Sequence, residues 1–315
     1  MSNRLIKPNR TPVSEKKVNA HTVSNFVKQE SYTVENFGFQ WTKWRETQLD
    51  SKSGVQITRK RLERILSALP KPILEKEKNI NLLEAGCGSG RFSEILSEFE
   101  SINLTCVDLS DAVLANAENH SQLNPSKISF VKADILDLPY DDSTFDVVVC
   151  LGVVQHTPDS KKTLAELMRV LKPGGAIVWD HYEFGLRRYT KLPVLLLRPF
   201  VKRMSSKAQL KTCEFLINLF LPFHKVLAKR SILLQRVFSR ISPATSYYHV
   251  YPELNESQQK TWAFLDTHDT LTAWYENWLT ENQAKRLMLD LGAKTVSLRK
   301  GGNGLEVVSI KNGDK

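Results

Sequence analysis

The sequence predicts an α/β protein in which a mostly parallel sheet carries a helical insertion. Short apolar runs alternate with amphipathic stretches, which is the element order of a parallel sheet. Acidic residues follow successive apolar runs, so they gather at one edge of that sheet. A glycine-rich turn joins one of these runs to a helix. The chain has 315 residues, of which 41% are hydrophobic and 25% charged, as is ordinary for a globular protein.

The glycine-rich turn is the most specific local signal. Residues 82–92 read Leu-Leu-Glu-Ala-Gly-Cys-Gly-Ser-Gly-Arg-Phe, an apolar strand followed by Gly86, Gly88 and Gly90 on alternate positions. Glycine lets a ligand approach the main chain closely because no Cβ intervenes. The turn therefore predicts a site for a nucleotide-type cofactor. An ordinary strand-to-helix turn is the alternative.

The residues around the glycines disfavour a dinucleotide. The dinucleotide fingerprint places its third glycine at the sixth position of the motif, where this chain has Arg91. Glu84 precedes the first glycine by two residues, and its charge would repel a diphosphate and attract an ammonium group. S-adenosylmethionine (SAM) carries an amino group, a sulfonium and no phosphate, so it fits this turn better than NAD.

The turn resembles the corresponding motif of class I SAM-dependent methyltransferases, Glu/Asp-x-Gly-x-Gly-x-Gly. Further along, His-Thr-Pro-Asp at 156–159, Arg-Val-Leu at 169–171 and Lys-Pro-Gly-Gly at 172–175 are similar to the bacterial methyltransferase group labelled type 11. The resemblance is specific over residues 80–180. It implies a Rossmann-like sheet of seven strands, with a helical insertion between strands five and six.

Acids follow the later strands, which are expected over residues 102–108, 128–132, 145–151 and 176–180. Asp108 ends the second strand, where an acid binds ribose hydroxyls. The resemblance implies that Asp134 accepts a hydrogen bond from the adenine amino group and that Ile135 flanks the ring. It also assigns further residues to the cofactor pocket: Cys87, Leu109, Leu151 and His156.

Helices and a final strand pair complete the predicted core. Amphipathic stretches predict helices over residues 58–69 and 161–171. Thr280 and Gln283 form a capping-box signature at the start of a helix that runs to residue 291. Strands over residues 294–298 and 305–310 then close the sheet.

The chain divides into five predicted segments. Residues 1–30 are polar and basic without an apolar stretch, so we expect a disordered tail and no signal peptide. A cap segment with a helix is expected over 31–75 and the SAM-binding core over 76–182. A basic helical insertion is expected over 183–270, and the closing helix and strands over 271–315.

Aromatic residues provide candidates for gating the substrate site. The cap segment is dense in aromatic side chains, and in the resembled enzymes this region folds over the cofactor. Packing of the segment on the core is the alternative role. The gate candidates are Tyr32, Trp41, Trp44 and, after strand five, Tyr182.

The net charge of +10 is concentrated in the insertion. Residues 185–241 contain thirteen Lys or Arg and one acid, Glu214, so this segment carries +12. The apolar stretches between the charges are shorter than the ~20 residues that span a bilayer. This pattern predicts a helical lid whose outer face contacts anionic lipid, and a cap with a solvated basic face is the alternative. The clustered Leu and Phe fit nucleic acid less well.

The predicted reaction defines the candidate catalytic residues. Methyl transfer from a sulfonium is an in-line displacement, so the protein positions the acceptor and removes a proton when the acceptor is an alcohol. Candidate bases are His156, His181 and His268. A role in shaping the loop is the alternative for His156, and a buried hydrogen-bonded role is the alternative for His181. No paired ligands converge, so no metal site is predicted.

We therefore expect a SAM-dependent methyltransferase that acts on a small or lipid-linked acceptor, at oxygen in preference to carbon. The four cysteines show no Cys-x-x-Cys spacing, which favours a reducing cytoplasm, with a peripheral membrane location if the insertion binds lipid. C-methylation of a quinone-like ring and a non-catalytic SAM-binding or membrane-surface protein are the alternatives.

Overall fold

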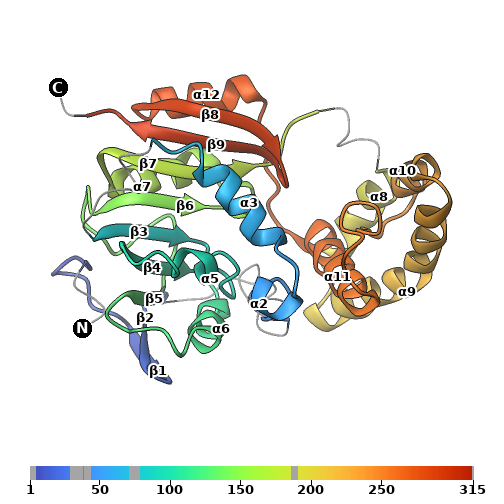
Figure 1. Cartoon of the computed structure of the whole chain (residues 1–315), viewed down its shortest axis with the longest axis horizontal. Coiled ribbons are helices and arrows are strands. Elements are labelled where there is room, and N and C mark those ends of the chain that lie inside the picture. The colour runs from blue at the N-terminus through green and yellow to red at the C-terminus, as the bar shows by residue number, and fades with distance from the viewer. Residues whose placement is uncertain (1–4, 29–37, 39–43, 71–78, 186–190, 314–315) are drawn as a thin grey trace. The chain divides into compact units, whose positions relative to one another are not determined.

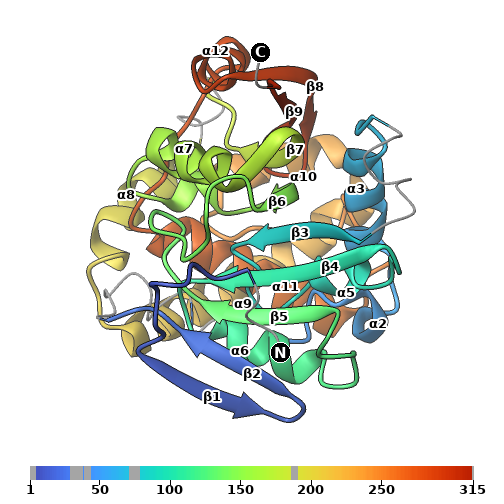
Figure 2. The same ribbon diagram turned by 90° about the vertical axis from the view of Figure 1, so that its left-hand side faces the viewer.

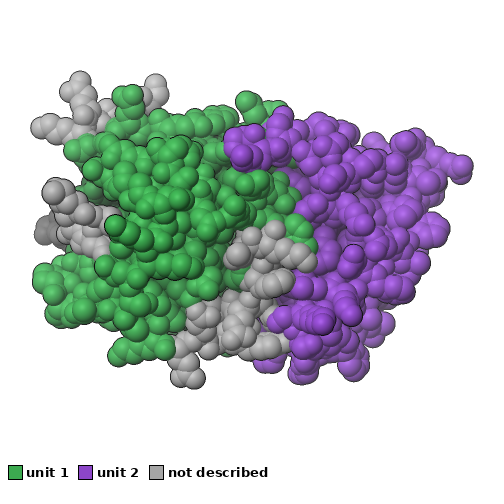
Figure 3. All heavy atoms as spheres, turned by 90° about the horizontal axis from the view of Figure 1, so that it is seen from below, with its two compact units in different colours: residues 1–50, 56–183, 275–315 green, residues 51–55, 184–274 purple. Residues whose placement is uncertain are grey.

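The structure is a computed structural model of the chain, and it describes residues 5–28, 38, 44–70, 79–185 and 191–313. The chain forms two compact units (Figure 3). Unit 1 comprises residues 1–50, 56–183 and 275–315, and unit 2 comprises residues 51–55 and 184–274. Unit 2 thus contains residues 184–270 of the predicted insertion, together with residues 51–55 and 271–274.

Unit 1 is built on a single sheet (Figure 1). Seven strands match the prediction: β3 (Ile80–Ala85), β4 (Ile102–Asp108), β5 (Ile128–Lys132), β6 (Phe145–Cys150), β7 (Leu171–His181), β8 (Ala293–Gly301) and β9 (Gly304–Lys311). They lie in the order β5-β4-β3-β6-β7-β9-β8, parallel except for β9, which is antiparallel to both neighbours. The predicted fold class is confirmed, with unit 2 inserted between the fifth and sixth of these strands.

Two further strands correct the prediction of a disordered tail over residues 1–30. β1 (Ser14–Val18) and β2 (His21–Asn25) form an antiparallel hairpin, and β2 pairs in parallel with β5 at the edge of the sheet (Figure 2). Four of the five β1 residues are exposed. The segment looks polar in sequence because β1 is mostly exposed and because two of the three buried residues of β2, His21 and Ser24, are polar. Its charged outer strand also discourages pairing with another chain.

Helices cover both faces of the sheet. On one face, α3 (Ile57–Leu66), α5 (Ser93–Leu96) and α6 (Ala112–Asn119) share a buried apolar cluster with the strands. On the other face, α7 (Ser160–Val170) and α12 (Glu281–Asp290) share a second cluster. Because both faces are covered, the central strands are continuous apolar runs rather than alternating ones.

Two short elements and two helix caps complete the set of elements around the sheet. The helix α2 (Asp50–Ser53) precedes α3, and the 3₁₀ helix η1 (Val154–His156) follows β6. Asp159 caps α7 by accepting from two backbone amides of its first turn. The predicted capping box of α12 is confirmed, since Thr280 accepts from the amide of Gln283 and the Gln283 side chain accepts from the amide of Thr280.

Unit 2 is helical, with α8 (Leu192–Val201), α9 (Ser206–Arg230), α10 (Ile232–Ile241) and α11 (Glu256–Thr272). Both α10 and α11 pack on α8 and on α9. Buried apolar residues of α9 and α11 form much of its core, including Cys213, Ile217, Trp262 and Leu265. Within the described residues, no helix is long and apolar enough to cross a membrane. All four cysteines of the chain are free and buried.

A buried ionic cluster joins α3 to the sheet. The Arg61 guanidinium donates to Asp180 Oδ2 at 2.5 Å and to Glu306 Oε1 at 3.1 Å. Both carboxylates are at most 1% exposed, so they need this partner in place of water. Arg64 also pairs with Glu306, from the rim of the cluster. The cluster therefore holds α3 against the ends of β7 and β9.

Replacing Arg61 by Ala is expected to lower the free energy of unfolding by about 3–5 kcal/mol, because the buried Asp180 carboxylate loses its cation and Glu306 keeps only Arg64. The matched control is Arg59→Ala, on the same helix. Arg59 pairs with the exposed Glu98, and such surface pairs contribute less than about 1 kcal/mol. Urea denaturation of both variants measures the difference. Equal losses would show that the buried cluster contributes no more than the surface pair.

Candidate functional site

The glycine-rich turn lies between the carboxyl end of β3 and α5, and its glycines have different surroundings. Gly86 has φ +75°, and a Cβ there would lie 2.1 Å from a methyl carbon of Val153. Gly88 has φ +53°, and no described atom lies within 4 Å of the position a Cβ would take. Gly90 faces Asn116 of α6. Gly86 is therefore required by packing, whereas Gly88 faces open space that a cofactor could enter.

Asp108 fixes the middle of this turn. Its Oδ2 accepts a hydrogen bond from the amide of Gly88 at 2.9 Å. Its Oδ1 accepts from the amide and the hydroxyl of Ser110, at 2.9 and 2.7 Å. The carboxylate is only partly buried, so it keeps access to a ligand. The structure thus brings together two predicted cofactor residues from neighbouring strands.

Glu84 lies beneath the turn and is 2% exposed. Its Oε2 accepts from the Ser93 hydroxyl at 2.5 Å. Its Oε1 is buried and has no hydrogen-bond partner among the described residues. Burial raises the pKa of Glu84 to about 8, against the smaller opposing effects of Ser93 and Arg91. An unpartnered buried carboxyl oxygen beside bare main chain is the arrangement that an ammonium group would satisfy, so these residues fit SAM.

The other predicted cofactor residues lie along the same edge of the sheet. Asp134 follows β5 and accepts from the amide of Leu136 at 2.9 Å, which shapes a tight turn. Ile135 beside it is 8% exposed. Cys87 and Leu151 are buried near the ends of β3 and β6, and Leu109 after β4 is partly buried.

The loop after β6 packs on the glycine-rich turn through a contact that the sequence analysis did not identify. Asp180 at the end of β7 accepts from the amide of Gly152 through Oδ1, at 2.6 Å. Its Oδ2 accepts from the Arg61 guanidinium and from the side-chain amide of Asn303. The side chain of Val153, one residue after Gly152, fills the space above Gly86. The sequence signal that could have identified Asp180 is an acidic residue at the end of an apolar strand, as at Asp108.

His156 and Tyr182 form a pair next to this loop. His156 Nε2 lies 3.1 Å from the Tyr182 hydroxyl, and His156 Nδ1 lies 3.2 Å from the carbonyl oxygen of Tyr275. A carbonyl only accepts, so Nδ1 carries the proton in this contact and Nε2 accepts from Tyr182. Both side chains are partly exposed. The pair therefore presents a basic nitrogen and a hydroxyl at the carboxyl ends of β6 and β7.

The two other candidate bases are buried. His181 is fully buried, its Nε2 contacts the Ser160 hydroxyl at 3.0 Å and its Nδ1 contacts the Tyr182 carbonyl at 3.2 Å. Burial lowers the pKa of His181 to about 4. Both ring nitrogens are hydrogen-bonded within the protein. His181 therefore has the buried, hydrogen-bonded role that was the alternative to a catalytic base. His268 is a 3% exposed residue of α11, in unit 2, and burial lowers its pKa to about 4.

The gate candidates have mixed outcomes. Tyr32 and Trp41 lie outside the described residues. Trp44 lies in a turn and is partly exposed. Tyr182 contacts the ring of Trp278, with 5.1 Å between centroids. Trp278 belongs to the segment before α12, which returns to this edge because Asn277 donates to the carbonyl of Thr157 at 2.7 Å.

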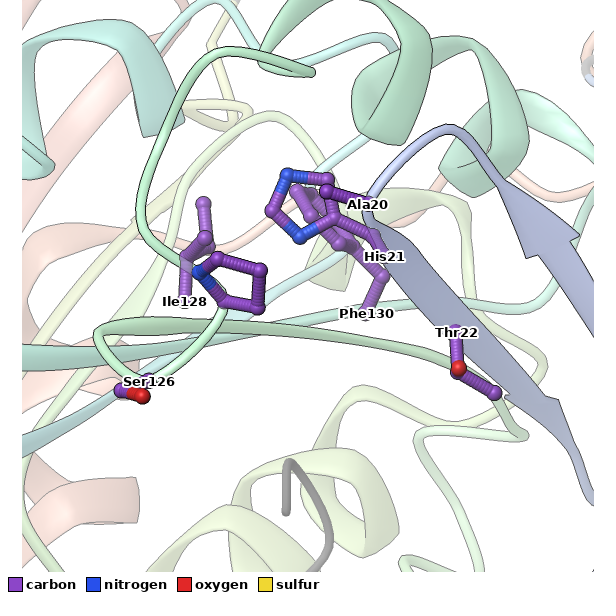
Figure 4. A pocket seen from close by; sticks show the side chains of 7 residues that line it. Ala20, His21, Thr22, Ser126, Ile128 and Phe130 are labelled. Carbon is purple, nitrogen blue, oxygen red and sulfur yellow. The ribbon is translucent and has the colours of Figure 1, made fainter.

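A metal site and a pocket elsewhere in unit 1 are the other candidate places for a ligand. Among the residues that the structure describes, no three His, Cys, Asp or Glu side chains gather to hold a metal ion. A pocket of about 190 Å³ lies near the amino ends of β2 and β5, lined by residues that include His21, Ser126 and Phe130 (Figure 4). The predicted cofactor residues follow the carboxyl ends of the strands, so this pocket is not their site.

Comparison with known proteins places the glycine-rich turn in a described domain family. Residues 83–179 match the family model of the methyltransferase domain. The match covers the turn, Asp108, Asp134 and His156. It confirms the predicted family for this part of the chain, and with it the predicted cofactor, SAM.

Individual relatives are similar over a third of the chain. Ubiquinone biosynthesis O-methyltransferase of Coxiella burnetii is 30% identical over 112 residues, 36% of this chain and 47% of the relative. Sterol 24-C-methyltransferase of Kluyveromyces lactis is 32% identical over 101 residues, 31% and 27% of the two chains. The chain thus spans about half the length of the first relative and about a quarter of the second. A solved structure of magnesium protoporphyrin IX methyltransferase from Synechocystis PCC 6803 with bound SAH has a TM-score of 0.49 and 11% identity, covering 89% of this chain and 98% of that chain.

Two alanine substitutions in the turn are expected to have different effects. Gly86→Ala forces a methyl group onto Val153, so it should destabilise the fold by about 1–3 kcal/mol more than Gly88→Ala does. Gly88→Ala places its methyl in open space and should weaken SAM binding by at least about tenfold. Urea denaturation and calorimetry with SAM measure the two effects. A Gly88→Ala variant that binds SAM as the parent does would contradict this assignment.

The binding of SAM near neutral pH is expected to release a proton from Glu84. With a pKa of about 8, Glu84 is mostly protonated at pH 7, and an ammonium group beside it lowers that pKa. Calorimetry in two buffers of different ionisation enthalpy should therefore give different binding enthalpies. In Glu84→Gln the difference between the two binding enthalpies should shrink, because glutamine has no carboxyl proton to release. Equal enthalpies in both buffers for the parent chain would rule out the coupling.

The same pKa predicts how stability changes with pH. Between the ordinary pKa of 4.5 and the folded value of about 8, the folded state binds a proton at Glu84 that the unfolded state has lost. The stability due to this group is therefore present below pH 4.5 and is lost as the pH rises towards 8. Urea denaturation of the SAM-free chain across this range should show a steeper decline than Glu84→Gln does. Parallel curves would contradict the raised pKa.

Proposed function

Because residues 83–179 form a SAM-dependent methyltransferase domain, we propose that this chain transfers a methyl group from SAM to a hydroxyl oxygen of a small or lipid-linked acceptor. A sugar, a polysaccharide precursor or a secondary metabolite is the acceptor class we favour. The observation that supports an acceptor that must lose a proton, as an alcohol does, is the pair of His156 and Tyr182. An alcohol acceptor loses a proton when its oxygen is methylated, and this pair can take it.

The position of the pair supports this role. His156 ends η1, and its amide donates to the carbonyl of Val153 at 2.8 Å. Val153 in turn packs on Gly86 of the glycine-rich turn. Only two residues therefore separate Val153, whose side chain contacts the turn, from the candidate base His156. An acceptor bound between them would lie close to both.

The proton has a defined route in this arrangement. SAM supplies the methyl group on its sulfonium, which becomes a thioether when the methyl leaves. The acceptor oxygen forms the new bond to carbon and gives up its proton. His156 Nε2 takes that proton directly when the acceptor displaces the Tyr182 hydroxyl. With Tyr182 in place, its oxygen takes the acceptor proton while its own proton passes to Nε2.

The contact with Tyr275 holds the ring for this task. The backbone carbonyl fixes the proton of His156 on Nδ1, so Nε2 stays available as a base. Once protonated, the imidazolium keeps both hydrogen bonds, because each partner oxygen can accept. The ring of Tyr182 also packs edge-on against His156, with centroids 5.3 Å apart.

C-methylation is the second candidate. One relative, similar over 31% of this chain, is named as a sterol 24-C-methyltransferase. Methyl transfer to a quinone-like ring carbon also releases a proton, so the same pair could serve it. Mass spectrometry and NMR of the product separate the two reactions, since an O-methyl ether and a C-methyl group differ in chemical shift. A SAM-binding protein without activity would release no S-adenosylhomocysteine with any hydroxylated acceptor.

We expect Tyr182→Phe and His156→Gln to lower turnover while SAM binding stays within a few-fold of the parent. Loss of a general base costs about 10²–10⁴ in rate, so His156→Gln should have the larger effect. Release of S-adenosylhomocysteine with the best acceptor of a hydroxylated panel measures turnover.

Tyr140→Phe is the matched control. Tyr140 is buried in unit 1, and its hydroxyl has no hydrogen-bond partner within the described part of the chain. Loss of that hydroxyl should leave turnover unchanged. Parent-like rates in both His156→Gln and Tyr182→Phe would exclude this pair as the base.

A further inference from the structure

The helix α10 has an inverted amphipathic pattern. Its one buried residue is the polar Gln235, whose side-chain amide donates to His224 Nδ1 at 2.9 Å. Its large aliphatic side chains are all exposed: Ile232, Leu233, Leu234, Val237 and Ile241. A helix of a water-soluble unit normally turns its apolar face inward. The Gln235–His224 contact and the ring of Phe238, which packs on α9, attach α10 to its unit, and the large aliphatic side chains point outward.

The neighbouring helices carry exposed apolar stripes as well. On α8 the exposed residues are Leu192, Leu195, Leu196 and Phe200, and on α9 they are Phe215, Leu219, Phe223 and Val226. Within each helix they recur at intervals of three or four residues, so they lie on one side. The buried residues of α9 include Cys213, Ile217 and Leu221, which lie on the opposite side. The helix α9 is therefore apolar on two faces, and its own unit covers only one.

These apolar side chains coincide with the basic segment. Thirteen of the twenty-one exposed large hydrophobic residues in the described part of the chain fall within residues 192–241. The same segment contains ten of the thirteen basic residues of 185–241 and its one acid. The fourth helix of the unit, α11, carries none of these exposed hydrophobic residues. Exposed apolar side chains and positive charge are thus concentrated on the same three helices.

The combination identifies the chemistry of the partner. An exposed apolar surface of this size marks an interaction site. A second copy of the chain would bring one +12 segment against another, which is unfavourable. An anionic bilayer offers acyl chains to the apolar side chains and negative headgroups to the bases. We propose that unit 2 docks on an anionic membrane surface through the stripes of α8, α9 and α10.

The basic residues suit this mode of binding. Arg236 lies between Leu233 and Val237 on α10, and Lys229 lies near the end of α9; both are exposed. Long basic side chains place their methylene groups along an apolar surface while the charge reaches the headgroups. None of these helices is long and apolar enough to span a bilayer, so the docking is at the surface.

Vesicle co-sedimentation of the full chain tests the proposal. We expect binding to vesicles of phosphatidylglycerol mixed with phosphatidylcholine, and much weaker binding to phosphatidylcholine alone. The double variant Leu233→Gln with Val237→Gln should weaken partitioning by at least about tenfold. Lys229→Gln with Arg236→Gln should weaken it about fivefold for each charge removed, and added salt should reduce that effect.

The helix α12 of unit 1 provides matched controls. Leu289 is 68% exposed, and Lys285 and Arg286 are also exposed. The variants Leu289→Gln and Lys285→Gln with Arg286→Gln should sediment as the parent does. Equal losses in these controls and in the α10 variants would overturn the proposal, as would failure of the parent to bind anionic vesicles. A dimer that Leu233→Gln with Val237→Gln converts to a monomer, without vesicle binding, would show instead that the stripes join two copies.

Discussion

The Asp180 carboxylate is the constraint on which the candidate site depends. One oxygen accepts from the amide of Gly152, and the other accepts from Arg61 and Asn303. Through Gly152 it fixes the loop after β6, whose Val153 packs on the glycine-rich turn. Through Arg61 it joins α3 to that loop. A fully buried charge requires such partners, so the loop, the helix and the strand end are held together.

The cofactor side of the site combines close packing with unsatisfied polarity. The side chain of Val153 occupies the space that a Cβ at Gly86 would take. The amide of Gly88 donates to Asp108, and Gly88 faces open space. Glu84 has one carboxyl oxygen without a hydrogen-bond partner in the described structure, and burial raises the pKa of this carboxyl group. Such a buried group is unfavourable in the free protein and becomes favourable when a cation arrives. The site is therefore complementary to a ligand that carries an ammonium group and little bulk near the main chain.

The two units differ in how they treat apolar residues. In unit 1, buried clusters on both faces of the sheet use the aliphatic side chains of the helices. In unit 2, α10 buries Gln235 and exposes its aliphatic side chains. Burial lowers the pKa of His224, the partner of Gln235, to about 4, so this contact is between neutral groups. The membrane surface that we propose as the partner of unit 2 would cover these side chains of α10, whereas α3 and α7 bury theirs within unit 1.

The sequence by itself determined the seven core strands, the glycine-rich turn, the capping box at Thr280 and the helical insertion, because each depends on local spacing or on a run of one residue type. Only the tertiary structure decided which residues meet. Arg61 and Glu306 lie 245 positions apart, and His156 meets Tyr182 across two strand ends. The edge hairpin of β1 and β2 escaped prediction because β1 is mostly exposed and the residues that β2 buries include the polar His21 and Ser24. The role of His181 also depended on the fold. A histidine at a strand end can act as a base when it is exposed, whereas His181 is buried and both its ring nitrogens are hydrogen-bonded.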